Sequence, residues 1–211
     1  MRGLIEKLLA NNSGKKKVIV IRHGESNGNV KPTVHGSSDY ELTDKGVEQA
    51  KEVYNTLEEY VDRVVHIRSS SMVRSIKTCH NAINVEKNKH LHDKLVYDHR
   101  IREFQLGTLE GAYCDTDEIP VEDYVTFWDV LLKGFVIPLG SEGGKEFKKR
   151  IITSLNDAKE GLNFYFAHSG VIYSLTNSYA NRVFVRNCGA VGFVFDDFNE
   201  KREFVGMFRN D

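Results

Sequence analysis

The sequence has little cysteine, little proline and no excess of charge of either sign. Its three cysteines, Cys79, Cys114 and Cys188, are odd in number and share no spacing typical of a metal or redox site. A disulfide framework is therefore not expected, and the thiols are predicted to be reduced. No proline- or glycine-rich linker divides the chain, and 211 residues suit one domain at about 150 residues per domain. We therefore predict a single domain spanning residues 1–211.

The sequence also lacks the charge and hydrophobicity patterns of nucleic-acid-binding and membrane proteins. Lys and Arg (29) nearly cancel Asp and Glu (30), so no basic surplus for nucleic acid is present. No apolar run reaches the roughly 18 residues of a membrane span. Arg2, Glu6 and Lys7 interrupt what would be the apolar part of a signal peptide. We expect a soluble, cytoplasmic protein without nucleic-acid or membrane partners, and the oligomeric state is left open.

Apolar residues make up 40% of the chain and fall into runs that predict strands. The uninterrupted run at 18–21 is typical of a strand buried on both faces of a parallel sheet. The segments 64–67 and 162–167 are predicted to be further strands. Two later segments, 190–195 and 203–208, are expected to pair with each other across a turn.

Apolar residues at helical spacing separate these strands. Thr43, and either Ser70 or Ser71, are candidate N-caps of two helices. Further helices are predicted at 147–158 and 171–179. Strands that alternate with helices predict an α/β fold, a three-layer α/β/α sandwich around a mainly parallel sheet.

Two polar clusters follow predicted strands at the points where those strands end. Arg22-His23-Gly24 comes after the first strand, and His168-Ser169-Gly170 comes after the strand at 162–167. Ligands of parallel sheets bind at the carboxyl ends of the strands, so two neighbouring strands would bring both histidines to one rim. The glycine after each histidine allows a ligand or a backbone segment to approach closely.

The residues at this rim suit phosphate chemistry. Arg22 and Arg74 are candidate phosphate ligands because a guanidinium group stays charged and offers a fork of donors. Nearby guanidinium groups should lower the pKa of His23, which keeps its imidazole neutral and nucleophilic near pH 7.

A phosphorylated histidine also needs an acid and a group that stabilises the transferring phosphoryl. Glu103 or Glu25 could protonate the leaving oxygen and later activate water. His168 could bind the equatorial oxygens and stabilise the charge that develops there. This chemistry requires neither a metal nor a cofactor.

Six ordered pieces between about Lys17 and Val191 resemble the histidine phosphatase superfamily, in the branch of cofactor-dependent phosphoglycerate mutases and related phosphatases. The pieces are Arg22-His23-Gly24-Glu25-Ser26 with Asn29; Leu42-Thr43 with Gly46; Ser69-Ser70 with Arg74 and Thr78; Glu103 with Gly107, Glu110 and Gly111; Glu142 with Glu146, Phe147 and Arg150; and His168-Ser169-Gly170. A single Arg-His-Gly triplet would be weak support, whereas six pieces in order are strong support.

The resemblance implies a phosphoglycerate mutase-like fold and specific roles for these residues. By resemblance, His23 is the phosphorylated histidine and Glu103 is the proton donor. His168 is the second catalytic histidine and, like Arg22, Asn29 and Arg74, contacts phosphate. Three departures from the pattern, at Ser75, at Tyr173 and at Ser141-Glu142-Gly143, remove none of these groups.

The segment 111–139, a predicted lid insert, bears on whether the protein is a phosphatase or a mutase. A mutase must hold a second anionic group, but this insert has Lys133 as its single basic residue against six acidic residues: Asp115, Asp117, Glu118, Glu122, Asp123 and Asp129. Such a lid would repel a multiply anionic substrate. We therefore predict a phosphatase acting on a small-molecule phosphate monoester, or alternatively a phosphoprotein.

The aromatic residues of the insert allow two interpretations. Tyr113, Tyr124, Phe127, Trp128 and Phe135 suit an apolar or aromatic leaving group, or the packed face of a covering helix.

Other patterns support competing readings. His90 and His92 would share one face of a strand, as a metal site requires, although a solvated connection is the simpler interpretation. Ser169 lacks the glycine-x-serine-x-glycine elbow of serine hydrolases, because Phe166 takes the first glycine's place. Ser26 and Asn29 could cap a helix rather than bind a ligand.

Two further alternatives concern the chain as a whole. A catalytically silent interaction module could keep the same fold, and phosphoglycerate mutase-type transfer is the alternative within the family. Residues 1–14 are predicted to be a helical appendage that packs on the domain or serves as a docking element.

Overall fold

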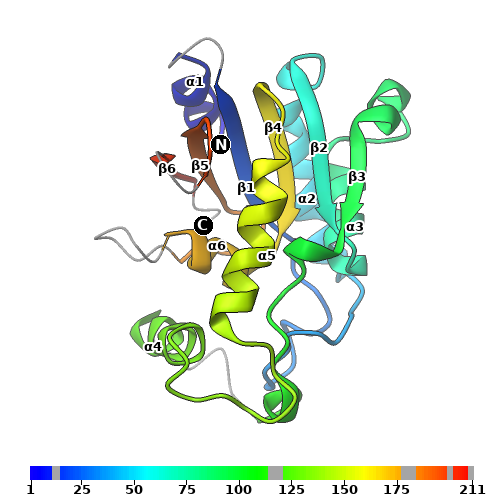
Figure 1. Cartoon of the computed structure of the whole chain (residues 1–211). Coiled ribbons are helices and arrows are strands. Elements are labelled where there is room, and N and C mark those ends of the chain that lie inside the picture. The colour runs from blue at the N-terminus through cyan, green and yellow to red at the C-terminus, as the bar shows by residue number, and fades with distance from the viewer. Residues whose placement is uncertain (11–14, 114–120, 177–183, 199–201, 209–211) are drawn as a thin grey trace.

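The computed structural model describes residues 1–10, 15–113, 121–176, 184–198 and 202–208, which form one sheet with helices on both faces (Figure 1). The strands are β1 (Lys16–Arg22), β2 (Val64–Ser70), β3 (Leu95–Asp98), β4 (Gly161–Ala167), β5 (Ala190–Phe195) and β6 (Arg202–Phe208). Their order is β3-β2-β4-β1-β5-β6. The first four in this order are parallel, whereas β5 is antiparallel to β1 and β6. This confirms the predicted mainly parallel sheet.

The helices are α1 (Arg2–Ala10), α2 (Asp44–Leu57), α3 (Val73–Ala82), α4 (Val121–Leu132), α5 (Gly144–Asn156) and α6 (Ser169–Thr176). Short 3-10 turns occupy Glu58–Tyr60, Lys89–Lys94, His99–Ile101 and Gly107–Leu109. No helix within the described ranges is long and apolar enough to span a bilayer.

The three layers follow from the alternation of side chains along β1. Ile19 and Ile21 belong to a core with the apolar faces of α1, α2 and α3. Val18 and Val20 belong to a second core with α4, α5 and α6, on the other face of the sheet. In the register of β1 and β4, Arg22 lies opposite Ala167, so both strands end side by side, directly before His23 and His168.

Helix α1 packs on the domain through Leu4, Ile5 and Leu8, which are buried. It contacts β5 and β6. Gly192 of β5 makes room for it, because a Cβ there would lie 3.0 Å from Leu4 Cδ1. The packing interpretation of residues 1–14 therefore holds for 1–10, and residues 11–14 lie outside the described part of the chain.

The predicted cap of α3 by Ser70 or Ser71 is wrong. Strand β2 continues through Ser70, and the N-cap position is Met72, which makes no side-chain capping bond. The carboxylate of Asp39 instead accepts from the Val73 backbone N–H at 2.9 Å. By contrast, Thr43 caps α2 as predicted, since its hydroxyl accepts from Gly46 N–H.

The segment that contains His90 and His92 is a 3-10 turn, Lys89–Lys94, in which both histidines are exposed. This agrees with the simpler interpretation, a solvated connection, rather than a strand with both histidines on one face. Within the described residues, no group of three or more His, Cys, Asp or Glu side chains could hold a metal ion.

Three predictions fall partly on undescribed residues. Helix α6 accounts for the predicted helix up to Thr176, and 177–179 lie outside the description. Cys114, Asp115, Asp117 and Glu118 also lie outside it, whereas Cys79 and Cys188 are buried free thiols.

Candidate active site

A polar pocket lies at the carboxyl ends of β1 and β4. It encloses about 300 Å³, including open space at its mouth, and its lining includes Arg22, His23, Asn29, Arg74, Glu103 and Ser169. Because this volume includes open solvent, the enclosed space is smaller than that of an ordinary small-molecule site. The pocket therefore suits a small polar group, and the rest of a ligand would extend outside it.

The imidazole of His23 is held by a hydrogen bond from one ring nitrogen, Nδ1, to the backbone, which leaves the other nitrogen, Nε2, free of this bond. Its backbone N–H donates to Ala167 O at the end of β4, and its Nδ1 lies 2.7 Å from Gly24 O. A carbonyl can only accept, so Nδ1 carries the proton and Nε2 keeps its lone pair. Burial lowers the pKa of His23 well below its usual value, and the charges of Arg74 and Arg22 lower it further. His23 is thus neutral near pH 7, and its Nε2 lone pair can act as a nucleophile.

The turn after His23 requires glycine because α2 approaches it closely. A Cβ on Gly24 would lie 2.5 Å from Gly46 O at the start of α2. The Gly24 N–H donates to Thr78 Oγ1 of α3 at 2.9 Å. The glycine after the first histidine therefore serves close packing of backbone, one of the two possibilities that the sequence indicated.

Arg22 and Arg74 bring two positive charges to the pocket from different elements. Arg22 donates to Val185 O at 3.0 Å. Arg74, on α3, donates to Ser38 O at 2.8 Å and to Gly36 O at 3.0 Å. Both guanidinium groups are almost completely buried, so their charges act in a medium of low dielectric and favour a bound anion.

The amide of Asn29 is oriented by three donors. Its Oδ1 accepts from Ser26 N–H at 3.0 Å, from Ser26 Oγ at 3.1 Å and from Asn187 Nδ2 at 3.2 Å. With the oxygen occupied, the amide NH₂ is the group available to the pocket. Asn187, which also donates to His23 O, is a site residue that the sequence analysis missed.

Geometry distinguishes three chemically equivalent glutamates, Glu25, Glu103 and Glu110, which in the sequence only the family motif ranks. Glu25 bonds Thr43 Oγ1 and Lys45 Nζ, away from the pocket. Glu110 accepts from the backbone N–H groups of 36–38, the loop whose carbonyls hold Arg74. Glu103 is buried in the pocket, where its Oε2 accepts from Gly170 N–H at 3.0 Å.

Glu103 is also the glutamate whose environment favours the protonated form. Burial raises the pKa of Glu103, and this outweighs the N–H donors of Gly170 and Phe104 and the charges of Arg74 and Arg22. In contrast, the pKa of Glu110 is lowered, because its hydrogen bonds outweigh its partial burial. Glu103 can therefore donate a proton at a pH where Glu110 is ionised.

His168 lies beside His23, with the ring centroids 5.2 Å apart, and is fully buried. Its Nε2 is 2.8 Å from Ser70 Oγ. Ser70 Oγ accepts from Met72 N–H, so its own hydrogen is free to donate to Nε2. With Ser70 as the donor, the His168 proton is on Nδ1, which has no hydrogen-bond partner among the described residues. Ser70 thus orients the second histidine, a role that the sequence analysis did not foresee.

The segment leading to Glu103 is clamped by Arg150 of α5. Arg150 donates to the carbonyls of Arg100, Arg102 and Glu103 at 2.6, 2.8 and 3.0 Å. Its guanidinium also bonds both carboxylate oxygens of Glu142. This clamp fixes the backbone on which the Glu103 side chain is mounted.

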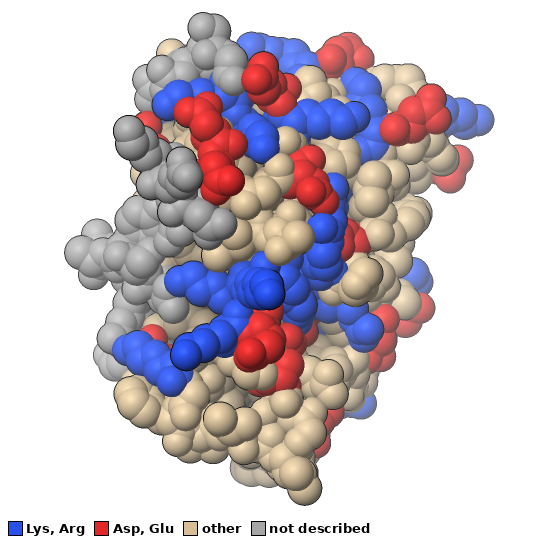
Figure 2. Space-filling model, in the orientation of Figure 1, with Lys and Arg blue, Asp and Glu red and all other residues tan. Residues whose placement is uncertain are grey.

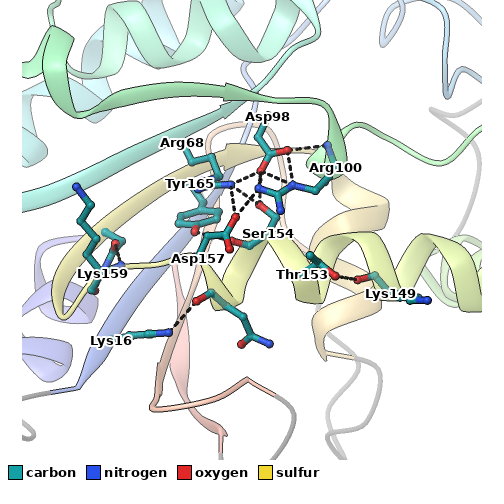
Figure 3. A network of polar contacts seen from close by, with 12 residues as sticks. Lys16, Arg68, Asp98, Arg100, Lys149, Thr153, Ser154, Asp157, Lys159 and Tyr165 are labelled. Carbon is teal, nitrogen blue, oxygen red and sulfur yellow. Dashed lines mark hydrogen bonds and ion pairs between the residues drawn. The ribbon is translucent and has the colours of Figure 1, made fainter.

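A second network anchors the start of the same segment (Figure 3). Asp98, at the end of β3, bonds Arg68 of β2, Arg100, and Ser154 of α5. Burial raises the pKa of Asp98, but hydrogen bonds from Arg100, Ser154 and Arg68 outweigh it, and the pKa lies below its usual value. The carboxylate is therefore ionised and paired inside the protein.

The residues predicted for the site are brought together from distant parts of the sequence. Five of them line the pocket, namely Arg22, His23, Asn29, Arg74 and Glu103, and His168 lies against His23. His90 and His92 do not line it. The arrangement can bind a small anion, attack it with a neutral imidazole and donate a proton from a buried carboxyl.

Comparison with known proteins points to the same family as the motifs. The chain matches the histidine phosphatase superfamily (branch 1) over residues 18–185. It is 30% identical over 164 residues to phosphoglycerate mutase-like protein 4 of Arabidopsis thaliana, covering 75% of this chain and 69% of that protein. It is 28% identical over 189 residues to a probable phosphoglycerate mutase of Shigella boydii, covering 82% and 81%.

Solved structures share the fold. A phosphoglycerate mutase from Thermus thermophilus superimposes with a TM-score of 0.68 at 22% identity, covering 92% of this chain and 99% of that one. A structure described as mycobacterial hydrolase 1 gives 0.69 at 20% identity, covering 90% and 96%. These likenesses confirm the predicted phosphoglycerate mutase-like α/β fold.

Proposed function

Because the chain belongs to branch 1 of the histidine phosphatase superfamily, we propose that it hydrolyses a phosphate monoester through a phosphohistidine intermediate. Phosphoryl transfer through a histidine fits the family in general, and hydrolysis is the more specific part of the proposal. One observation carries it: a neutral imidazole, two buried guanidinium groups and a carboxyl with a raised pKa converge on one pocket, and a second neutral imidazole, that of His168, lies against the first.

The first half-reaction transfers the phosphoryl group to the protein. The Nε2 lone pair of His23 attacks phosphorus, the bond from phosphorus to the ester oxygen breaks, and Glu103 gives its proton to that oxygen. Arg22, Arg74 and the Asn29 amide hold the non-bridging oxygens. His168 donates from Nδ1 to the charge that develops on them.

The second half-reaction returns the protein to its starting state. Glu103, now a carboxylate, takes a proton from water while the water oxygen attacks phosphorus. The bond from phosphorus to His23 Nε2 breaks, phosphate leaves and the imidazole is neutral again. No step of this scheme uses a metal or a cofactor.

The charges around the pocket support a substrate with a single anionic group. Among the described residues that line the pocket, Arg22 and Arg74 are the permanent cations, and both serve the phosphoryl position. The exposed residues Phe135, Val136, Ile137 and Leu139 lie between α4 and α5, and the lower end of the face in Figure 2 is mostly uncharged. These surroundings favour a monoester over a bisphosphate.

Two details of the insert modify the sequence argument. Asp129 is paired with Tyr173 and Lys133 rather than facing a substrate. Trp128 is buried and Phe127 is half-buried, as in a covering helix, whereas Tyr113 and Phe135 are exposed. Aromatic contact with the leaving group would therefore involve Tyr113 or Phe135.

Phosphoglycerate mutase-type transfer is the second candidate, because relatives carry that name. Phosphate release from a panel of monoesters, with chelator present, should be measured beside isomerisation of 3-phosphoglycerate with its bisphosphate primer. Hydrolysis with an acid-labile phosphoprotein intermediate is expected. Isomerisation without hydrolysis would establish a mutase instead, and no phosphoprotein with any substrate would favour a silent interaction module.

The Arg150 clamp gives a prediction about the proposed acid. Arg150→Ala should lower kcat by about 10- to 100-fold with little change in KM, because a displacement near 1 Å of a reacting group costs rate on this scale. Esters with poor leaving groups should be affected more than activated aryl phosphates. Lys149→Ala, on the exposed side of the same helix, is the control. Equal losses for both kinds of ester would show that the clamp does not act through Glu103.

A further inference from the structure

Helix α4 approaches the proposed acid over Gly170. A Cβ on Gly170 would lie 2.4 Å from Glu103 Oε1 and 2.4 Å from Trp128 Cη2. The carboxyl group and the edge of the indole ring therefore share the space that a larger residue at position 170 would fill. Trp128 is only 4% exposed, so this edge is dry.

The indole is fixed in place by two neighbouring aromatic rings and by the anchoring of its own helix. Its ring packs edge-to-face on Phe104, the residue after the acid, with centroids 6.3 Å apart, and on Phe127 at 5.5 Å. The next residue, Asp129, accepts a 2.6 Å hydrogen bond from the Tyr173 hydroxyl of α6. Helix α6 also carries Gly170, whose N–H donates a hydrogen bond to Glu103. The bond between Tyr173 and Asp129 therefore links α4 to the helix that contacts Glu103.

We propose that Trp128 is a positioning residue that excludes bulk water from the Oε1 side of Glu103 and keeps its carboxyl group protonated until the leaving oxygen needs the proton. This inference rests on the proposed function, in which Glu103 is the acid. It assigns to the insert a contribution to the reaction itself, in addition to covering the pocket.

The pKa of Glu103 depends on opposing effects, and these explain why an apolar neighbour that excludes water is important. Arg22 from β1 and Arg74 from α3 favour the ionised form, as do the N–H groups of Phe104 and Gly170. Ser169 adds a hydroxyl at 3.3 Å.

The remaining neighbours of Glu103 do little to oppose the groups that favour its ionised form. His23 and His168 are neutral, and Arg150 of α5 bonds the Glu103 carbonyl rather than its carboxyl. Burial is the force that favours the protonated carboxyl group. If water reached Oε1, the effect of burial would weaken, and the charges of Arg22 and Arg74 would then favour the ionised carboxylate.

The test compares Trp128→Gln, which brings a polar group to the carboxyl, with Trp128→Phe, which keeps an apolar ring. For a poor leaving group, Trp128→Gln should lower kcat about 10- to 100-fold, as partial loss of general acid catalysis requires. The basic limb of its pH–rate profile should move to lower pH. An activated aryl phosphate should lose less than about threefold, and Trp128→Phe should restore most of the rate.

A double-mutant comparison separates this role from simple packing. On a Glu103→Gln background, Trp128→Gln should cause no further loss, because the group through which it acts is gone. Leu131→Ala, three residues on in the same helix and equally buried, should lower the melting temperature without moving the pH profile. If Trp128→Gln does not fold, Trp128→Leu gives the same comparison with a smaller expected effect.

Two results would overturn the inference. Equal losses with both kinds of leaving group, or a full further loss on the Glu103→Gln background, would leave Trp128 a packing residue. Failure of the proposed function would look different, because the parent protein would then form no phosphohistidine with any monoester.

Discussion

Replacing His23 with asparagine should lower phosphate release on the order of 10⁴-fold or more and abolish the phosphoprotein intermediate. In the proposed scheme this imidazole is the only nucleophile, and removing a nucleophile from another covalent enzyme has an effect of this size or larger. Asparagine is the substitution of choice because its amide can still donate to Gly24 O, the bond that His23 makes through Nδ1 at 2.7 Å. The pocket should therefore keep its shape while losing its reactive atom.

The measurement is phosphate release beside trapping of the acid-labile phosphoprotein. His66→Asn is a matched control, because His66 is a histidine on β2 that is as buried as His23, at 5% against 4% exposed. It lies toward the start of β2, opposite Asn163 and away from the strand ends that form the pocket. If His23→Asn kept most of the activity, covalent transfer to this residue would be ruled out.

The position of the site could be predicted from sequence because it depends on local patterns. A buried apolar run shows where β1 ends, and Arg22-His23-Gly24 follows that end directly. The same is true of β4 and His168-Ser169-Gly170. Because β1 and β4 pair in parallel with Arg22 opposite Ala167, the carboxyl ends of both strands lie at the same edge of the sheet.

The supporting residues could not be predicted because they act across long sequence separations. Arg150 binds carbonyls nearly 50 residues away, and Asn187 reaches Asn29 across 158 residues. Nothing local marks these contacts. The three glutamates illustrate the same limit, since Glu25, Glu103 and Glu110 are chemically equivalent and differ only in what surrounds them.

The mistaken prediction of the N-cap of α3 has a physical reason of this kind. A serine before a helix is typical of an N-cap, but β2 extends to Ser70 and the buried His168 ring takes its hydroxyl. Tertiary contacts therefore overrode the local sequence pattern at this position.

Asp98→Asn is expected to lower the free energy of unfolding by about 3–5 kcal/mol, the scale for breaking a buried ion pair by removing one partner. The Asp98 carboxylate is 3% exposed and accepts hydrogen bonds from Arg68, Arg100 and Ser154 (Figure 3). Without its charge, the buried guanidinium of Arg68 would retain, among the described residues, the Ser154 hydroxyl and one half-exposed carboxylate, that of Asp157, each at 3.4 Å. The end of β3 and the segment leading to Glu103 should loosen together.

The pH dependence of this loss gives an independent check on the ionised pair. The pKa of Asp98 in the folded protein lies below its ordinary 3.8, so its stabilising contribution is complete above that pH and is lost as pH falls through the folded value. The difference between parent and variant in urea unfolding should thus be constant above about pH 5 and shrink in stronger acid. Asp62→Asn, at a carboxylate 88% exposed beside His90, should change stability by less than about 0.5 kcal/mol. A difference for Asp98→Asn that stayed constant in strong acid would mean that lost packing, rather than the lost charge, destabilises the variant, and the clamp on the Glu103 segment would then not depend on this ion pair.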